Sequence, residues 1–219
     1  MQHFQLNNDL IRDFVLDDAQ REIVWEKYQN GLAEKKFERA KVTGDNPYSY
    51  DRICENFPFN YIENPEMFDI SSSFLELTDD LAYDYPEDLW FGQFEFVKYD
   101  GNGETFRPHQ DDNIHASDHN RLFTAVTMVD KTDDMVGGHL HIWPKLVPTP
   151  DGHFWYDDRF RYTVDLEPWE TVIFPAYYFH EASPVLQGRR TILISWAQIE
   201  KYMPRNCSHL RPHSTCVEL

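Results

Sequence analysis

The sequence predicts an α+β fold in which helices near the N-terminus support a jelly roll, a sandwich of two antiparallel sheets. Three observations lead to this prediction. In the first part of the chain, apolar residues recur at three- and four-residue spacings, as they do along one face of a helix. Further on, short runs rich in β-branched and aromatic residues are separated by Asp-Gly, Gly-Gly and Pro-containing turn signals. Helices followed by six or more such strands are typical of α+β proteins with two packed sheets.

Two helices are predicted before the strands begin. The first covers residues 9–40, where Asp17 and Asp18 are suited to a helix N-terminus. The second covers residues 65–83 and stops before a Tyr-Pro pair, because proline does not continue a helix. We expect both helices to pack against one of the two sheets.

The segment between the helices, residues 41–62, is rich in aromatic and turn-forming residues. This composition favours a loop, which we expect to lie over a cleft. Residues 48–61 and the aromatic run 154–156 are the two candidates for a lid that closes over a bound ligand.

Six strands are predicted in the second part of the chain. Each is short, and β-branched or aromatic residues predominate. The polar residues 201–219 that follow are expected to form a loosely ordered tail. The predicted strands are residues 90–99, 122–129, 139–143, 161–166, 171–174 and 190–196.

Length and composition indicate one globular domain. The chain has 219 residues, of which 41% are hydrophobic and 16% aromatic, enough for a sizeable core. We expect a single domain with helical support and the aromatic loop in residues 1–88, the jelly-roll core in residues 89–200 and the tail in residues 201–219. No apolar run approaches the length of about 18 residues that a membrane span needs, and no secretory signal is visible, so a cytoplasmic protein is expected.

The charge balance and the cysteines exclude some classes of function. With 20 basic and 38 acidic residues the net charge is −18, which repels phosphate backbones, so double-stranded nucleic acid is not an expected partner. The charge would suit a basic peptide or a cationic small molecule, or would simply keep the protein soluble. Cys54, Cys207 and Cys216 have no CxxC spacing, which favours free thiols over disulfides or structural zinc.

His109-Gln110-Asp111 is the only His-x-Asp sequence in the chain. Residues two apart in an extended strand point to the same side, so both side chains can reach one ion. His180, which we expect the strand at residues 171–175 to bring in, would add a second imidazole. Two histidines and one carboxylate on one face of an octahedral ion leave three positions open, as in Fe(II) oxygenases. Alone, the His-x-Asp pair would more often be a helix cap or a surface pair.

Arg190 lies ten residues beyond His180, next to Arg189. Strand alternation sends the two arginines to opposite faces, and Arg190 shares its face with Ile192 and Ile194. An arginine on an apolar inward face needs an anionic partner, and a guanidinium can hold a carboxylate by two parallel hydrogen bonds. The alternative is an ion pair on an edge strand.

Together these residues resemble the Fe(II)- and 2-oxoglutarate-dependent dioxygenases, most closely the prolyl 4-hydroxylase-like branch. The resemblance covers about residues 90–200, roughly half the chain. Any one motif is weak, but their order and spacing are specific. The motifs that resemble the branch are Phe96-Val97-Lys98-Tyr99, Gly103 to His109, Gly137-Gly138-His139-Leu140, Ser183-Pro184-Val185 and Gly188.

The resemblance implies a double-stranded β-helix (jelly-roll) core, with Fe(II) bound by His109, Asp111 and His180. It also implies that Arg190, with Tyr99, holds 2-oxoglutarate, which is consumed with O₂ to give succinate and CO₂. Tyr99 stands about two residues farther from the first histidine than the branch leads us to expect. In the halogenases of the superfamily a small residue replaces the carboxylate, so Asp111 favours hydroxylation of an unactivated C–H bond.

Four further histidines lie near these motifs. His139 and His141 could form a second metal-binding pair, but they lack a carboxylate at a suitable spacing, so a core or supporting role is favoured. His115 and His119 are expected in a loop near the mouth of the site, where they could touch the substrate.

The resemblance leaves the substrate open. A proline within a peptide is the leading candidate, because the motifs are closest to those of prolyl hydroxylases. The first alternative is a free amino acid or another small metabolite. The second is a jelly-roll binding protein without turnover, which a complete set of ligands argues against. The sequence does not indicate an oligomeric state.

Overall fold

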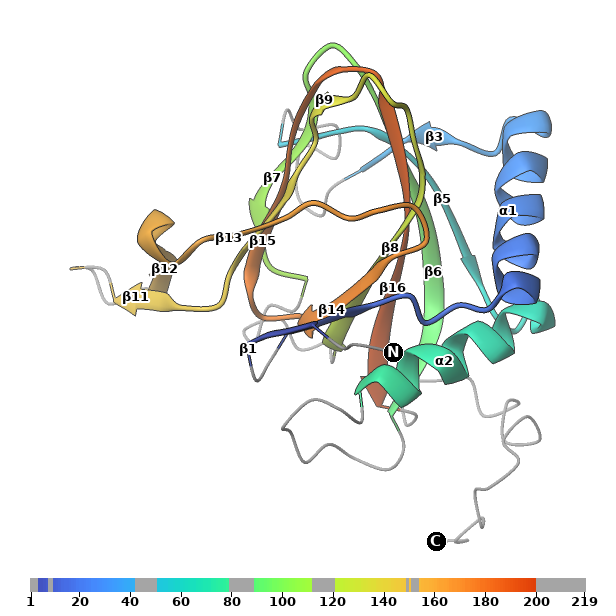
Figure 1. Cartoon of the computed structure of the whole chain (residues 1–219), viewed down its shortest axis with the longest axis horizontal. Coiled ribbons are helices and arrows are strands. Elements are labelled where there is room, and N and C mark those ends of the chain that lie inside the picture. Colours follow the sequence, from blue (N-terminus) through green and yellow to red (C-terminus); the bar gives the residue numbers. More distant parts are fainter. Residues whose placement is uncertain are drawn as a thin grey trace, which may run out of the picture.

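The computed structural model describes residues 4–7, 10–41, 51–78, 89–111, 121–148, 150 and 154–199. Within these residues the chain forms two antiparallel sheets that face each other, with two helices on the outer face of the larger one (Figure 1). This confirms the predicted α+β jelly roll with helices against one sheet. Predictions about residues 42–50, 79–83 and 201–219, and about His115, His119, Cys207 and Cys216, lie outside the described residues.

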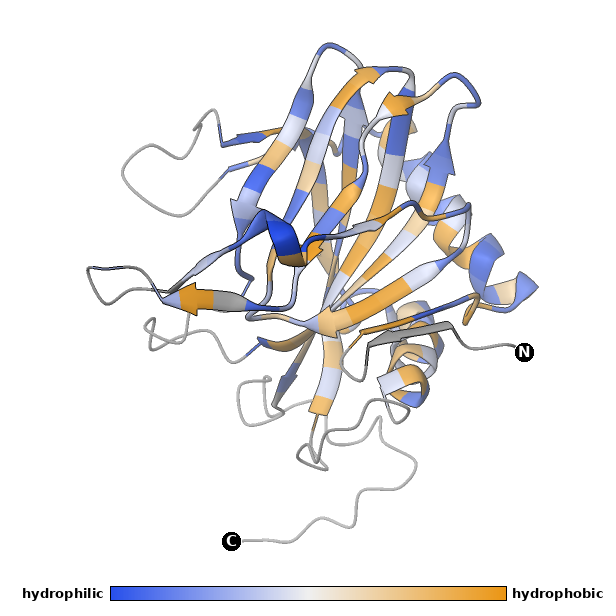
Figure 2. Ribbon diagram, turned by 60° about the vertical axis from the view of Figure 1, so that its left-hand side comes forward, coloured by the Kyte–Doolittle hydropathy of each residue, from blue (hydrophilic) through white to orange (hydrophobic). Residues whose placement is uncertain are grey.

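The larger sheet forms one wall of the barrel. Long strands occupy its centre and short strands its edges, and apolar residues are concentrated in the central strands (Figure 2). In spatial order its strands are β1 (Phe4–Asn7), β2 (Leu10–Asp13), β14 (Thr171–Pro175), β8 (Arg121–Lys131), β16 (Arg189–Ile199), β6 (Leu89–Asp100), β5 (Glu55–Asn60) and β3 (Glu38–Arg39).

The smaller sheet forms the opposite wall, and a separate two-stranded sheet projects beside it (Figure 1). The smaller sheet contains β13 (Tyr162–Val164), β10 (Leu140–Trp143), β15 (Phe179–Gln187), β7 (Glu104–His109) and β4 (Arg52–Ile53), with β9 (Val136–Gly137) paired to β15; the projecting sheet contains β11 (Leu146–Pro148) and β12 (Phe154–Tyr156).

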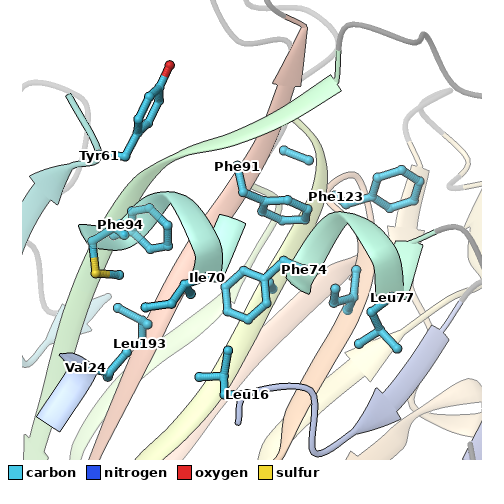
Figure 3. Close-up of a cluster of buried hydrophobic side chains, with 14 of the residues drawn as sticks. Leu16, Val24, Tyr61, Ile70, Phe74, Leu77, Phe91, Phe94, Phe123 and Leu193 are labelled. Atoms are coloured by element: carbon cyan, nitrogen blue, oxygen red, sulfur yellow. The ribbon is translucent and has the colours of Figure 1, made fainter. Parts of the chain in front are cut away.

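The helices α1 (Asp18–Ala33) and α2 (Phe68–Thr78) cover the outer face of the larger sheet. A buried cluster of aromatic and aliphatic side chains fills the space between them and the strands (Figure 3). Phe74 of α2 packs against Phe91 of β6, with ring centroids 5.5 Å apart. Burial of this much apolar surface is the main force that holds the helices to the sheet. Neither described helix has the length and apolar character needed to cross a membrane.

The first helix is shorter than predicted at both ends. It begins after Asp17, whose side chain accepts a hydrogen bond from the Gln20 backbone while the Gln20 side chain accepts one from the Asp17 backbone. It ends at Glu34, and Lys35 then takes a left-handed backbone conformation with φ 55°. The residues expected to extend the helix instead form β2 and β3, so the prediction of a helix over residues 9–40 was wrong outside residues 18–33.

The described part of residues 41–62 is not a loop over a cleft. Residues 52–53 and 55–60 are strands β4 and β5. Phe57 packs against Phe37, with ring centroids 5.8 Å apart, and Phe59 stacks on Phe94 at 5.6 Å. These aromatic side chains belong to the core under α1, which corrects the prediction of a lid for the described part of that segment.

The two longest strands of the smaller sheet, β7 and β15, were missed, as were the two-residue strands β4 and β9. Strands β7 and β15 each contain a proline, Pro108 or Pro184, and such residues demote a sequence as a candidate strand. In β15 the pairing with β7 shifts register twice, which accommodates the irregular sequence. The predicted second helix also began too early, because residues Pro65–Met67 form a separate 3₁₀ turn.

Candidate active site

The ends of β7 and β15 bring three metal-ligand side chains together. His109 is the last residue of β7 and pairs across the sheet with His180 of β15. Asp111 follows β7, and its Oδ1 lies 3.6 Å from His109 Nε2 while its Oδ2 lies 3.4 Å from His180 Nε2. Their ligand atoms all lie within 4.8 Å of one another, and no other such group occurs among the described residues.

Hydrogen bonds fix the orientation of each ligand. The Nδ1 of His109 lies 2.8 Å from the Arg107 carbonyl oxygen, and the Nδ1 of His180 lies 3.0 Å from the Tyr178 carbonyl oxygen. A carbonyl oxygen can only accept, so each Nδ1 carries a proton and each Nε2 is the ring nitrogen that faces Asp111. The Thr124 hydroxyl donates to Asp111 Oδ2 at 2.7 Å, which sets the plane of the carboxylate.

The charges of the three groups are coupled. Burial by itself would raise the pKa of Asp111, but His180 and His109 outweigh it and hold that pKa well below its usual value. Burial lowers the pKa of His109, and the neighbouring His180 lowers it further. Burial would also lower the pKa of His180, but Asp111 reverses this and raises it. The group therefore offers one carboxylate and at least one neutral imidazole, the protonation states that bind a divalent metal.

The backbone around the group differs from the expected one in two respects. Asp111 lies beyond the end of β7, and its backbone N–H donates to the Ala176 carbonyl oxygen at 3.0 Å. His180 lies on β15, because the strand at residues 171–175 ends in a turn at residues 176–178 before β15 begins. A turn between two strands, and not the first strand itself, delivers the distal histidine.

Arg190 lies inside the barrel, on the central strand β16. It is 2% exposed and pairs across the sheet with Tyr99 of β6, with its guanidinium carbon 4.7 Å from the centre of the Tyr99 ring. Burial raises the pKa of the Tyr99 hydroxyl and lowers the pKa of Arg190. Arg189 points to the other side, where it is bound by Asp130 at 3.1 Å. The alternation of the two arginines is as the sequence predicts.

The guanidinium of Arg190 is not fully satisfied by the protein. Its Nη1 donates to the Gly138 carbonyl oxygen, whereas its Nε is buried with no acceptor among the described residues. Gly138 has φ +68°, and a Cβ there would lie 2.9 Å from a methyl carbon of Val185. The glycine therefore lets the backbone approach the arginine closely. A buried guanidinium with a spare donor fits a carboxylate ligand.

A cavity of about 860 Å³ connects the three-residue group with Arg190. Several of its lining residues were not singled out by sequence: Thr124, Arg52, Glu95 and Phe106. Strand alternation from Tyr99 would have found Glu95, which shares its face. No local signal marks Arg52.

His139 and His141 are not part of the three-residue group. His141 lies on the face of the smaller sheet that points away from the cavity, where its Nδ1 is 3.0 Å from the Thr163 hydroxyl. Its Nε2 lies 3.8 Å from Glu181, and burial lowers the pKa of His141. His139 borders a smaller hollow of about 530 Å³. These positions agree with a supporting role and not with a second pair of ligands.

Comparison with protein families gives one match. Residues 94–198, from within β6 to within β16, match the family described as the 2OG-Fe(II) oxygenase superfamily. The matched segment contains the three-residue group, Tyr99 and Arg190. No curated protein matches the sequence.

Solved structures show the same fold at low identity. A prolyl 4-hydroxylase from Pseudomonas putida has a TM-score of 0.64 and 16% identity over 87% of this chain and 92% of its own. A prolyl hydroxylase from Trichoplax adhaerens, in complex with a peptide of hypoxia-inducible factor, has a TM-score of 0.62 and 18% identity over 90% and 86%. SnoN, an α-ketoglutarate-dependent epimerase of nogalamycin biosynthesis, has a TM-score of 0.64 and 18% identity over 97% and 89%.

Proposed function

The chain belongs to the 2OG-Fe(II) oxygenase superfamily, and we propose that it hydroxylates an unactivated C–H bond at a centre held by His109, Asp111 and His180. As a member of this superfamily it is an oxygenase that uses Fe(II) and 2-oxoglutarate. The observation that carries the proposal is the geometry of the three ligand side chains, whose donor atoms lie within 4.8 Å of one another at one end of the cavity.

Each residue has a defined task in this proposal. The two Nδ1 hydrogen bonds hold the imidazoles so that their Nε2 atoms point at the metal, and Thr124 holds the carboxylate. Bound Fe(II), with 2-oxoglutarate and O₂, supplies the oxidising chemistry that no side chain provides. Arg190 binds the far carboxylate of 2-oxoglutarate through the guanidinium donors that the protein leaves unused.

The walls of the cavity position the substrate and exclude water. Phe106 stacks on His109, with ring centroids 3.5 Å apart, and shields one side of the metal end. The buried side chains of Leu140 and Val126 line the path towards Arg190. Tyr99 closes the far end, where its hydroxyl is a second donor for the same carboxylate. The cavity therefore combines apolar side chains with fixed polar and charged groups, which can orient a bound small molecule.

Peptidyl proline is the leading substrate. Trp196 lines the cavity with the Arg121 guanidinium 3.9 Å above its ring, and Trp155 of β12 lines the rim with 51% of its surface exposed. Aromatic surfaces of this kind suit a proline ring and an extended peptide. The described neighbours include prolyl hydroxylases, one of them with a peptide bound.

A free amino acid or another metabolite is the alternative substrate. The fold likeness to SnoN favours it, because that protein was solved with a small molecule, nogalamycin RO. A binding protein without turnover is not supported, since such a protein has no need for a complete ligand set and a buried Arg190.

The test is substrate-dependent turnover. The protein is incubated with Fe(II) and 2-oxoglutarate, and succinate release is measured with a panel of proline-containing peptides and of free amino acids. We expect succinate release to rise with a peptide, together with a mass gain of one oxygen atom on proline. The Asp111→Ala variant is the control. Turnover with a free amino acid and with none of the peptides would favour the metabolite alternative, and no succinate from any arm would contradict the proposal.

A further inference from the structure

The cavity lining contains an arginine, Arg52, to which the proposed function gives no role. Arg52 lies on β4, at the edge of the smaller sheet, and forms an ion pair with Glu95 of β6 in the larger sheet. The pair therefore spans the gap between the two walls. The side chains are only 13% and 9% exposed, and Asn56 donates to the same Glu95 oxygen at 3.0 Å.

The hydrogen bonds of Arg52 are incomplete. Its Nη2 donates to Glu95, its Nη1 donates to the Lys41 carbonyl oxygen at 3.3 Å, and the guanidinium also interacts with the Cys54 side chain, but its buried Nε has no acceptor among the described residues. A buried donor without a partner is costly, and most such groups in proteins are satisfied by water or by a ligand. The Arg52 side chain lines the cavity and keeps 13% of its surface exposed, so an oxygen atom of a ligand there can reach the guanidinium.

Arg52 is close to the metal end of the cavity. Its guanidinium carbon lies 4.9 Å from the centre of the Phe106 ring, which in turn stacks on His109. The backbone of Glu95 pairs with Ile194 of the neighbouring strand β16, and this pairing fixes where the ion pair lies along the larger sheet.

Arg190 is farther along the same two strands. It pairs with Tyr99, which lies four residues beyond Glu95 on β6. The two guanidinium groups therefore serve different depths of the cavity, and one ligand carboxylate at Arg190 leaves Arg52 available for another molecule.

The described lining of the cavity is more basic than acidic, although the whole chain has a net charge of −18. One of its acidic residues belongs to the three-residue group, and another is already paired with Arg52. The lining includes the basic residues Lys41, Arg52, Arg107, Arg121 and Arg190 and the acidic residues Asp51, Glu95 and Asp111.

We propose that Arg52, held in place by Glu95, binds a carboxylate of the substrate, so that the enzyme selects substrates with an acidic group near the oxidised carbon. The inference rests on the proposed function and narrows its substrate class. The carboxylate is either the α-carboxylate of a free amino acid or an acidic side chain beside a peptidyl proline. Both present the same two oxygens to the guanidinium.

Binding is measured first, without turnover. Tryptophan fluorescence of the protein is a suitable signal because Trp196 lines the cavity. The probes are matched pairs that differ in one group: L-proline with L-prolinamide, and the capped dipeptides acetyl-Pro-Asp-amide with acetyl-Pro-Asn-amide. In at least one pair, we expect the carboxylate member to bind roughly tenfold or more tightly than its amide twin. The pair that shows the preference identifies the source of the carboxylate.

Three variants separate recognition from structural support. Arg52→Gln should abolish the preference within the pair while the Kd of 2-oxoglutarate stays as in the wild type. Arg52→Lys keeps the charge and should retain part of the preference. Arg189→Gln removes an arginine outside the cavity and should retain all of it. Circular dichroism and the melting temperature establish that each variant is folded. Should Arg52→Gln not fold, Arg52→Lys and Glu95→Gln take its place, and each should reduce the preference.

The outcomes are distinct from those of the proposed function. A failure of both carboxylate probes to bind, or a preference that survives in the folded Arg52 variants, overturns the inference. So does a variant that loses affinity for 2-oxoglutarate and not for the carboxylate probe, because Arg52 would then serve the co-substrate. A preference that depends on Arg52, in a protein that releases no succinate with any substrate, would instead contradict the proposed function alone.

Discussion

The two faces of the larger sheet differ, although the same strands form both: each buries apolar side chains, but the inner face also carries charged groups of the cavity. On the outer face, Phe94 and Phe96 of β6 and Leu193 of β16 pack into the apolar cluster under the helices. On the inner face of the same two strands, Glu95 of β6 and Arg190 of β16 line the cavity. Because adjacent residues of a strand point to opposite faces, a residue that packs against the helices can be next to one that lines the cavity. Substitutions on the outer face should change folding, and those on the inner face should change binding and turnover.

The largest effect is expected from the metal ligands. His109→Ala, Asp111→Ala and His180→Ala should each abolish turnover, because each removes one of the three side chains that we propose hold the metal. The wild type should bind one Fe(II), or Mn(II) as a substitute, per chain. Metal content by atomic spectroscopy after gel filtration, together with succinate release, measures both effects. Full metal content in all three variants would contradict the assignment.

The outer face should respond through stability. Phe94 is 1% exposed and stacks on Phe59, so Phe94→Ala should lower the free energy of unfolding by about 3–5 kcal/mol. Turnover per folded molecule should stay close to that of the wild type, because Phe94 does not line the cavity. Urea unfolding gives the first quantity and an assay well below the melting temperature gives the second. Lost turnover in a folded variant would break the separation of the two faces.

Arg190 and Arg189 test the same alternation with one type of side chain. Arg190→Ala should weaken the binding of 2-oxoglutarate by about 2–5 kcal/mol, since truncation of one partner of a buried charge pair is costly. Arg189→Ala should change it by less than about 1 kcal/mol, because that arginine is 44% exposed at its surface pair with Asp130. Titration of 2-oxoglutarate into the metal-loaded variants measures both. A larger effect at Arg189 would show that the inward face is assigned to the wrong arginine.

A smaller effect is expected where a hydrogen bond supports a ligand. Thr124→Val removes the hydroxyl that donates to Asp111 and should weaken metal binding by about 1 kcal/mol. Thr124→Ser keeps the donor and should bind metal almost as the wild type does. Calorimetric titration with Mn(II) compares the two variants. Equal affinities in Thr124→Val and Thr124→Ser would mean that the hydroxyl does not orient the carboxylate.

Local sequence patterns predicted the parts of the site that depend on local geometry. The alternation of Arg189 and Arg190 follows from strand periodicity, and the His-x-Asp pair with a distal histidine follows from the chemistry of the ligands. The long strands β6, β8 and β16 were predicted because their composition matches their conformation.

The missed features depend on pairing between distant segments. The aromatic residues 55–60 form a strand because β6 offers them a partner, and otherwise they have the composition of a loop. Arg52 faces the cavity because β4 pairs with β7, a contact between residues more than fifty positions apart. No local pattern in one sequence contains that information.

The projecting sheet of β11 and β12 has a consequence for how this protein could diversify. Among the described residues its two strands hydrogen-bond to each other and not to either wall of the barrel, yet Trp155 and Tyr156 reach the rim of the cavity. Their rings contact the barrel, as Trp155 contacts Phe179 with ring centroids 5.3 Å apart. Insertions, deletions and substitutions in this hairpin would therefore alter the rim without removing hydrogen bonds between the strands of the two larger sheets. It is the place where evolution or library design can exchange one substrate preference for another at the smallest risk to the fold.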